Sequence, residues 1–235
     1  MTAHRIHALI PAAGRSVRFG GTTLKQYAHL LGRPVLAHSI DAVRASSAVL
    51  SVTVALAEDD GIYEELLRPS YPNVRTVTGG DSRAQTVMNG LAFILEQDPD
   101  CGWVLVHDAA RPCLTRDALR RLLRCGLGSP DGAILAVPVH DTLKIADESG
   151  RIARTVDRTR YWAAQTPQLF PARDLAANLQ AALTAGEAPT DEAAAMERAG
   201  RRPLLVEDSH SNIKITGAED LALAQFILQG QSFDD

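Results

Sequence analysis

The chain has 235 residues, of which 46% are hydrophobic, and a formal net charge of -4. That hydrophobic content can bury a core and excludes a globally disordered chain, while the length fits one large domain or a domain with an inserted lobe. The weakly acidic balance excludes an overall basic field for nucleic acid, so any anionic ligand must be held by a local cluster of cations.

Cysteine usage and hydropathy favour a cytoplasmic protein without a membrane partner. Cys101, Cys113 and Cys125 are too few and too widely spaced for a disulfide framework, and no Cys-x-x-Cys pair indicates zinc. The first 14 residues have no long apolar run typical of a signal peptide. No apolar stretch approaches the roughly 20 residues that span a bilayer.

Short apolar runs alternate with amphipathic segments up to Pro138. This alternation predicts a Rossmann-like α/β fold, with a mostly parallel sheet and helices on both faces. Ligands bind such sheets at the carboxyl ends of the strands, here the loops after Ile10, Thr78 and His107. The predicted strands are 6–10, 49–56, 74–78, 103–107 and 133–139, and the predicted helices are 34–46, 59–67, 82–97 and 115–126.

The pattern changes after Pro138. Residues 139–160 alternate polar and apolar side chains, and Asp147–Gly150 is typical of a turn, which predicts an antiparallel β-arm projecting from the sheet. An isolated hairpin is marginal in water, so we expect this arm to pack on a partner subunit. The sequence therefore predicts a single domain, 1–235, with 139–160 as an inserted dimerisation arm.

The rest of the chain returns to alternating elements. A helix is predicted after Pro171 and another over 190–200, followed by strands at 203–208 and 212–215 and a last helix from Gly217. Lys214 lies in the middle of the second of these strands, where a lysine between isoleucines usually extends to solvent.

The loop after the first predicted strand combines small residues with cations. Ala12, Ala13 and Gly14 leave backbone amides open to a ligand, and Arg18 and Lys25 can reach phosphate oxygens. The loop matches neither the Walker A motif nor Gly-x-Gly-x-x-Gly. A surface loop with incidental cations is the alternative, but the position after the first strand favours a nucleotide site.

A second loop, Gly79–Gly90, has the same layout. Gly80 permits close backbone approach, Asp81 and Arg83 offer directional hydrogen bonds, and Thr86 lies on the first turn of a predicted helix. The alternative is a Gly-Gly turn in which Asp81 or Ser82 caps that helix.

The third loop follows a wholly apolar strand and begins with Asp108. A carboxylate at this point suits Mg²⁺, which prefers one or two carboxylates together with substrate phosphates. The alternative is an ion pair between Asp108 and Arg111 that stabilises the turn. His107 is interpreted as structural, because no second His or Cys lies at ligand spacing.

Seven motifs in order from Pro11 to Gln225 carry a family resemblance: PAAGRSVRFG…LKQY, GGDSRAQTV, VLVHDAARP, TVDR, QTPQ, TDEAAAME and NIKIT…EDLALAQ. Together they resemble the 2-C-methyl-D-erythritol 4-phosphate cytidylyltransferases, CTP-dependent enzymes of the non-mevalonate isoprenoid route. Two positions depart from the usual pattern: Thr86 replaces a frequent serine, and Leu24 replaces a frequent proline before Lys25.

The resemblance implies a role for each candidate residue. Ala12, Ala13 and Gly14 would line the CTP site, with Arg18, Lys25 and Lys214 on its phosphates. Gly80, Asp81, Arg83 and Thr86 would read cytosine and position the nucleotide, while Asp108 would lie near the metal and the reacting phosphate. Arg111, Thr142, Arg158 and Thr166 would hold methylerythritol phosphate, with Thr142 and Arg158 acting in the partner's site of a homodimer. Arg18, Lys25, Arg158 and Lys214 are the implied catalytic residues.

The chemistry explains why no general-base motif is present. A phosphate monoester has a second pKa of about 6, so the attacking dianion already dominates at neutral pH. The reaction needs cations that relieve repulsion between two anions. A ribitol 5-phosphate cytidylyltransferase and a non-catalytic nucleotide-binding protein remain alternatives, whereas a glycosyltransferase would normally show Asp-x-Asp at the end of a buried strand.

Overall fold

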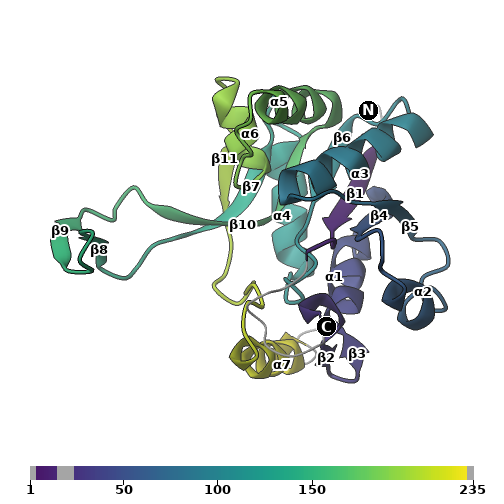
Figure 1. The fold of residues 1–235 in the computed structure, drawn as a ribbon, viewed down its shortest axis with the longest axis horizontal. Helices are drawn as coiled ribbons and strands as arrows, with labels where there is room; N and C mark the ends of the chain where they lie inside the picture. Colours follow the sequence, from purple (N-terminus) through teal and green to yellow (C-terminus); the bar gives the residue numbers. More distant parts are fainter. Residues whose placement is uncertain (1–3, 15–23, 232–235) are drawn as a thin grey trace.

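The computed structural model describes residues 4–14 and 24–231. Among them, seven strands form one sheet in the order β11-β7-β10-β6-β1-β4-β5 (Figure 1). All neighbours are parallel except β10, which runs antiparallel to both β6 and β7. The strands are β1 (Ile6–Pro11), β4 (Val49–Leu56), β5 (Arg75–Thr78), β6 (Trp103–Val106), β7 (Ala133–Pro138), β10 (Trp162–Pro171) and β11 (Leu204–Glu207).

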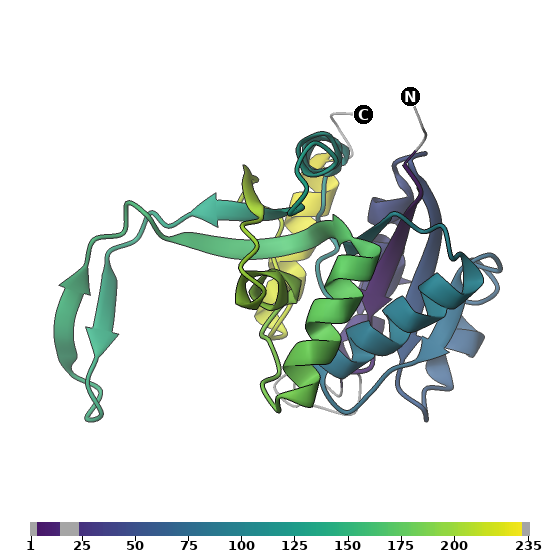
Figure 2. The same ribbon diagram turned by 90° about the horizontal axis from the view of Figure 1, so that it is seen from above.

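Helices cover both faces of this sheet, as the sequence predicts (Figures 1 and 2). One face packs against α1 (Val35–Arg44), α2 (Ile62–Leu66) and α4 (Arg116–Gly126). The other packs against α3 (Arg83–Gln97), α5 (Ala172–Thr184) and α6 (Glu192–Arg198). The predicted mostly parallel α/β fold is confirmed.

The alternation of side chains along β1 shows how one strand serves both layers. Ile6, Ala8 and Ile10 enter the core beneath α1 and α4, whereas Leu9 enters the core beneath α3. All four are completely buried. Because successive side chains of a strand point to opposite faces, a strand covered on both sides is apolar throughout, which is why its period-two signal is absent.

The predicted set of strands needs two corrections: one predicted strand is absent, and one observed strand was not predicted. Residues 212–215 do not form a strand. The amide of Ile215 donates to the carbonyl of Ala110 (2.8 Å), the side chain of Asn212 donates to the carbonyl of Thr166 (2.9 Å), and both Asn212 and Ile215 are buried. Conversely, β10 extends over ten residues that include Gln165, Thr166 and Pro167, a polar composition that is atypical of a central strand. Its register is irregular between Ala164 and Gln168, where that composition falls.

A third, smaller core lies under α7 (Glu219–Gln231), the predicted final helix. There Ala28, which follows the short 3-10 helix η1 (Lys25–Tyr27), packs with Ile215 and Ala224. Because Lys25 and Lys214 adjoin these buried positions, this small core brings both lysines to one edge of the sheet. The short strands β2 (His29–Leu30) and β3 (Arg33–Pro34) pair beside it.

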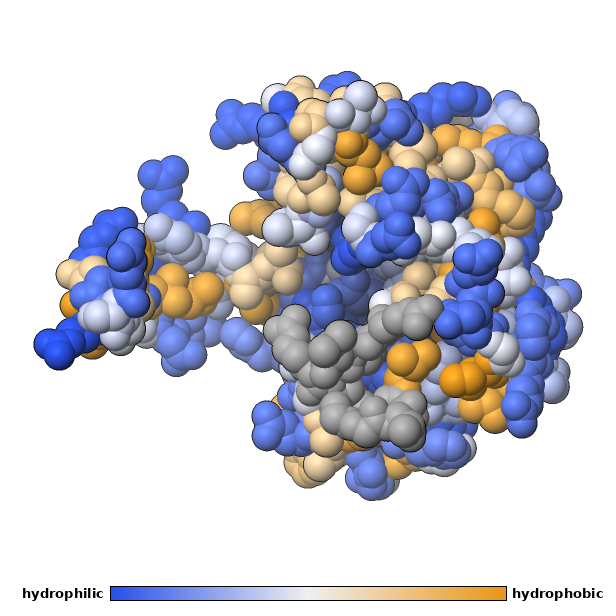
Figure 3. All heavy atoms as spheres, viewed as in Figure 1, coloured by the Kyte–Doolittle hydropathy of each residue, from blue (hydrophilic) through white to orange (hydrophobic). Residues whose placement is uncertain are grey.

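The predicted arm leaves the body between β7 and β10 (Figures 1 and 2). It ends in an antiparallel pair, β8 (Leu143–Ala146) and β9 (Ile152–Val156), joined by the predicted turn, in which Gly150 donates to the carbonyl of Asp147. Its visible surface carries polar and apolar side chains and stands clear of the body (Figure 3). No helix in the described part of the chain is long and apolar enough to cross a membrane.

Candidate active site

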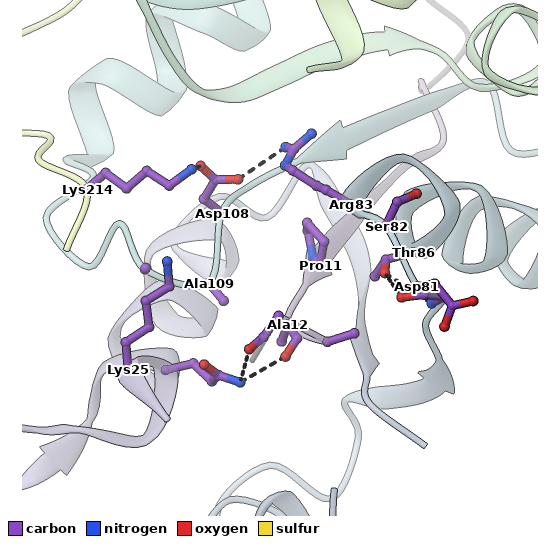
Figure 4. Close-up of a pocket in the computed structure, with 15 residues that line it drawn as sticks. Pro11, Ala12, Lys25, Asp81, Ser82, Arg83, Thr86, Asp108, Ala109 and Lys214 are labelled. Atoms are coloured by element: carbon purple, nitrogen blue, oxygen red, sulfur yellow. Dashed lines mark hydrogen bonds and ion pairs between the residues drawn. The ribbon is translucent and has the colours of Figure 1, made fainter. Parts of the chain in front are cut away.

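The three predicted loops and Lys214 converge on one pocket of about 370 Å³ at the carboxyl ends of β1, β5 and β6 (Figure 4). Neighbouring parallel strands end at the same edge, so this is where an α/β sheet binds ligands. The lining residues are Pro11, Ala12, Ala13, Gly14, Lys25, Gln26, Gly80, Asp81, Ser82, Arg83, Thr86, Asp108, Ala109, Ala110 and Lys214. Arg18 lies outside the described residues.

Hydrogen bonds to its backbone hold the first loop in place. The amide of Ala12 donates to the carbonyl of Ala55 (2.7 Å), and the side-chain amide of the buried Gln26 donates to the carbonyl of Ala12 (3.0 Å). Gly14 is exposed, and its carbonyl accepts from the same Gln26 amide (3.4 Å). Among the described residues, no atom lies within 4 Å of the position that a Cβ of Gly14 would take. A ligand can therefore approach the backbone at Gly14 closely.

The second loop packs directly against the first. A Cβ added at Gly79 would lie 2.7 Å from the Cβ of Ala13, so the close approach of the two loops requires glycine there. Ser82 caps α3 by accepting a hydrogen bond from the amide of Gln85 (3.1 Å), as the capping alternative predicts. The hydroxyl of Thr86 lies 3.1 Å from both the amide and the carbonyl of Gly80, so this side chain holds the loop in place.

Asp108 is the electrostatic centre of the pocket, with three cations around its carboxylate. The ammonium of Lys214 lies 2.8 Å from Oδ2, the guanidinium of Arg83 3.1 Å from Oδ1, and Nε of Arg111 3.7 Å from Oδ2. Burial alone would raise the pKa of Asp108, but Arg83 and Lys214 more than offset it and hold the pKa well below its usual range. The predicted pair with Arg111 is therefore present as one contact of three.

Lys214 corrects a prediction. Its side chain does not extend from a strand into solvent; it is 39% exposed and reaches Asp108 across the pocket (Figure 4). The burial of the neighbouring Ile215 fixes the backbone at this point, and the long lysine side chain covers the remaining distance. Sequence spacing could not indicate this contact, because the two residues are far apart in the chain.

A hydrogen-bonded chain positions the backbone of Asp108. The hydroxyl of Thr166, in β10, lies 3.0 Å from the amide of Asp108 and 3.1 Å from Nδ1 of His107, whose Nε2 lies 3.0 Å from the carbonyl of Arg111. Burial lowers the pKa of His107 to about 4, so the ring is neutral. These neighbours assign the proton to Nε2, which donates to Arg111, while Nδ1 accepts from Thr166. Thr166 is thus buried and engaged within the chain.

Arg83 has a second carboxylate partner that the sequence did not suggest. Its guanidinium donates to both oxygens of Glu192, at 2.6 and 3.0 Å, in addition to Asp108. Glu192 is in α6, 109 residues further along the chain, so no local spacing could predict the contact. The contact of Gln26 with the carbonyl of Ala12 was also not predicted, because nothing in the local sequence indicates that the side chain of Gln26 is buried beside the first loop.

Residues 6–230 match the family model for 2-C-methyl-D-erythritol 4-phosphate cytidylyltransferase. The chain belongs to this family. Relatives of that name are 44% identical in Tolumonas auensis, over 97% of this chain and 98% of that protein, and 46% identical in Vibrio parahaemolyticus, over 94% of each.

Solved structures agree with this family assignment. A crystal structure titled 4-diphosphocytidyl-2C-methyl-D-erythritol synthase matches with a TM-score of 0.84 and 39% identity, covering 96% of this chain and 99% of that one. The Francisella tularensis 2-C-methyl-D-erythritol 4-phosphate cytidylyltransferase matches with a TM-score of 0.80 and 32% identity, covering 95% and 99%. The resemblance seen in the sequence motifs is confirmed at the level of the family and the fold.

The candidate residues for the acceptor half of this cytidylyltransferase-family site are not brought together in one chain. Thr142 and Arg158 are exposed on the arm, away from the pocket, and no hydrogen bond ties either side chain to the body among the described contacts. Arg111 lies beside the pocket rather than on its surface and donates to the carbonyl of Asn212 (2.6 Å). Apart from Arg18, which is not described, one chain therefore brings the predicted nucleotide residues to one pocket and leaves two of the predicted acceptor residues apart.

Carboxylates at the pocket are few. Asp81 and Asp108 line it, and the described residues contain no group of three or more His, Cys, Asp or Glu side chains able to hold a metal ion by themselves. Asp108 retains lone pairs on both oxygens beyond its ion pairs, since each carboxylate oxygen can accept more than one bond. This donor set fits a Mg²⁺ ion held mainly by substrate phosphates and water with one protein carboxylate.

Proposed function

We propose that this chain transfers CMP from CTP to 2-C-methyl-D-erythritol 4-phosphate, giving 4-diphosphocytidyl-2-C-methyl-D-erythritol and pyrophosphate, in non-mevalonate isoprenoid biosynthesis. Family membership over nearly the whole chain supports the reaction. The observation that carries the proposal is the pocket itself, where open backbone amides, Lys25, Arg83 and Lys214 surround a buried carboxylate. This arrangement suits a polyanion.

In the proposed reaction an oxygen of the acceptor phosphate attacks the α-phosphorus of CTP. The new bond forms as the bond from the α-phosphorus to the bridging oxygen breaks, and pyrophosphate leaves with that electron pair. No general base is needed, because the acceptor is already a dianion at neutral pH. The neutral His107, whose nitrogens are both occupied, is accordingly placed as a structural group.

The proposed role of the cations is to offset charge as it develops. Lys25 enters the pocket from η1, opposite α3, and Lys214 enters from the segment after β11 (Figure 4). Cations fixed before the reaction stabilise the departing pyrophosphate without reorganisation. Arg18 is proposed to act with them on the strength of the family motif alone.

Mg²⁺ is the proposed cofactor, with Asp108 as its protein ligand. The ion would supply Lewis-acid stabilisation of charge on the phosphoryl oxygens. Asp108 suits this role because its surrounding cations keep it ionised and Thr166 fixes its backbone. A cytoplasmic location, a homodimer and the absence of nucleic-acid binding complete the proposal.

A homodimer would place the arm of one chain at the pocket of the other. Thr142 and Arg158 would then contact the acceptor in the partner's site. Support comes from their exposure on a hairpin that has no core of its own and from the exposed apolar side chains Ile145 and Ile152 on its strands.

The experiment is an assay of pyrophosphate release with CTP and Mg²⁺, using methylerythritol phosphate and ribitol 5-phosphate as alternative acceptors. Activity with methylerythritol phosphate and CTP, and little with ATP, GTP or UTP, is expected. Preference for ribitol 5-phosphate would favour the pentitol alternative. Tight CTP binding without turnover on either acceptor would instead favour a non-catalytic nucleotide-binding protein.

A further inference from the structure

Arg83 lines the pocket, but it binds the carboxylate of Glu192, which does not line the pocket. Glu192 is 1% exposed and contacts both nitrogens of the guanidinium fork, whereas Asp108, inside the pocket, contacts one. Such a two-oxygen, two-nitrogen pair fixes the plane of the guanidinium as well as its position.

The helix that carries Glu192 is itself anchored. Asp191 caps α6 by accepting from the amide of Ala194 (2.9 Å). The side chain of Gln168, in β10, donates to Asp191 (2.8 Å) and accepts from the amide of Ala193 (2.9 Å). Glu192 lies between these two anchored residues, so its carboxylate is held on a rigid support.

We propose that Glu192 is a positioning residue for the cytidylyl transfer reaction, holding Arg83 so that this arginine makes only one contact with Asp108 and leaves that carboxylate available to the reacting phosphate and its metal. This inference rests on the proposed function. Glu192 touches neither the pocket nor its ligands and acts through Arg83.

Competition between two carboxylates gives the inference its physical basis. A guanidinium next to two anions moves toward whichever binds it better, and a two-bond contact outweighs a single one. Burial raises the pKa of Glu192, while the adjacent Arg83 favours its ionised form. Without the charge of Glu192, Arg83 would be drawn to Asp108, which already has Lys214 at 2.8 Å. The carboxylate would then be saturated by the chain's own cations.

The test begins with Glu192→Gln, which keeps the size of the side chain, removes its charge and presents an NH₂ group to one nitrogen of Arg83. Loss of a supporting partner of this kind typically costs about 10- to 100-fold in activity. We expect a fall of that size in kcat, with the CTP dissociation constant from calorimetry changed less than about threefold. Glu197→Gln, the same change on the exposed side of α6, is the matched control and should match the unaltered chain.

A double-substitution cycle with Arg83→Gln separates positioning from a general structural role. If Glu192 acts through Arg83, then Glu192→Gln causes little further loss of kcat in the Arg83→Gln background. Losses that multiply would overturn the proposal, as would full activity of Glu192→Gln. A parallel loss of CTP affinity and thermal stability in step with kcat would also overturn it, because that pattern indicates a loosened fold.

Two further controls keep the outcome decisive. Should Glu192→Gln fail to fold, Glu192→Asp, which draws the carboxylate back from Arg83 by one methylene, is taken through the same cycle. Its loss of kcat should disappear in the Arg83→Gln background, and an equal loss in both backgrounds would overturn the proposal. Inactivity of the unaltered chain and of Glu197→Gln with CTP and methylerythritol phosphate would refute the proposed function. Activity of both without coupling between Glu192 and Arg83 would refute only the positioning role.

Discussion

The pocket and the arm differ in how many partners one chain supplies for their polar side chains. In the pocket, Asp108 meets three cations and Arg83 meets two carboxylates, all from one chain. On the arm, Thr142 and Arg158 face solvent. The difference teaches that the edge of a sheet can bring residues from distant parts of one chain into a single site. A projecting hairpin brings no other residues to its side chains until it packs against another surface.

Lys25→Ala tests the pocket side of this comparison with the largest expected effect. Loss of one preorganised charge should lower kcat by about 10²–10³-fold, equivalent to about 3–4 kcal/mol, with a much smaller change in CTP affinity. Steady-state kinetics together with calorimetry measure the two quantities. Arg173→Ala, which removes a cation from α5 far from the pocket, is the control; unchanged turnover in Lys25→Ala would show that the lysine has no part in the reaction.

The neutral His107, next to the pocket residue Asp108, makes the stability of the folded chain depend on pH. Its pKa is about 4 in the folded chain against an ordinary 6.5, so the unfolded chain binds more protons between these values and stability falls as pH falls through that window. We expect the free energy of unfolding in urea to drop by about 2–3 kcal/mol between pH 7.5 and 4.5. His107→Gln should lose this part of the slope, with His29→Gln as a control; an equal slope in His107→Gln would contradict the assignment.

The arm side is tested by Arg158→Ala, which should raise KM for the acceptor about tenfold, as expected for one lost charge-assisted contact of roughly 1.4 kcal/mol. KM for CTP should change little. Arg154→Ala, on the neighbouring exposed strand β9, is the matched control. A defect confined to CTP would remove Arg158 from the acceptor site.

Mixing the two impaired chains asks whether the arm acts in its own chain or in another. In a mixed dimer of Lys25→Ala and Arg158→Ala chains, one pocket would combine an intact Lys25 with an intact arm. Assayed at low acceptor concentration, the refolded mixture should therefore regain activity, up to about a quarter of the unaltered level for random pairing. Activity equal to the average of the separate chains would mean that each arm serves its own pocket.

The smallest expected effect concerns Thr86. Its hydroxyl contacts both backbone groups of Gly80, so Thr86→Ser should retain kcat/KM within about twofold, while Thr86→Ala should lose about 1 kcal/mol of loop stabilisation and show a higher KM for CTP. Equal kinetics of the two variants would show that the hydroxyl is dispensable.

The sequence predicted the alternating part of the fold well because buried parallel strands and their helices leave strong local patterns. It failed where tertiary contacts override composition. β10 reads as polar around Thr166, yet pairing with both β6 and β7 makes it a central strand. Residues 212–215 alternate like a strand, yet among the described contacts only the amide of Ile215 makes a backbone-to-backbone bond with another segment.

For the candidate site, the loops could be found from small residues and cations after strands, and the family resemblance assigned their roles. The partners of those residues could not be found. Lys214 reaches Asp108 and Glu192 reaches Arg83 over about a hundred positions of sequence, and such contacts leave no local spacing. Arg18 and the crossing of the arm stay predictions.

The length of β10 has a consequence for how the arm and the pocket are connected. The same strand continues from the arm at Trp162 to Thr166 beside Asp108 and on to Gln168 beneath α6. A single strand therefore links whatever surface receives the arm to the groups that fix the backbone of Asp108 and the start of α6.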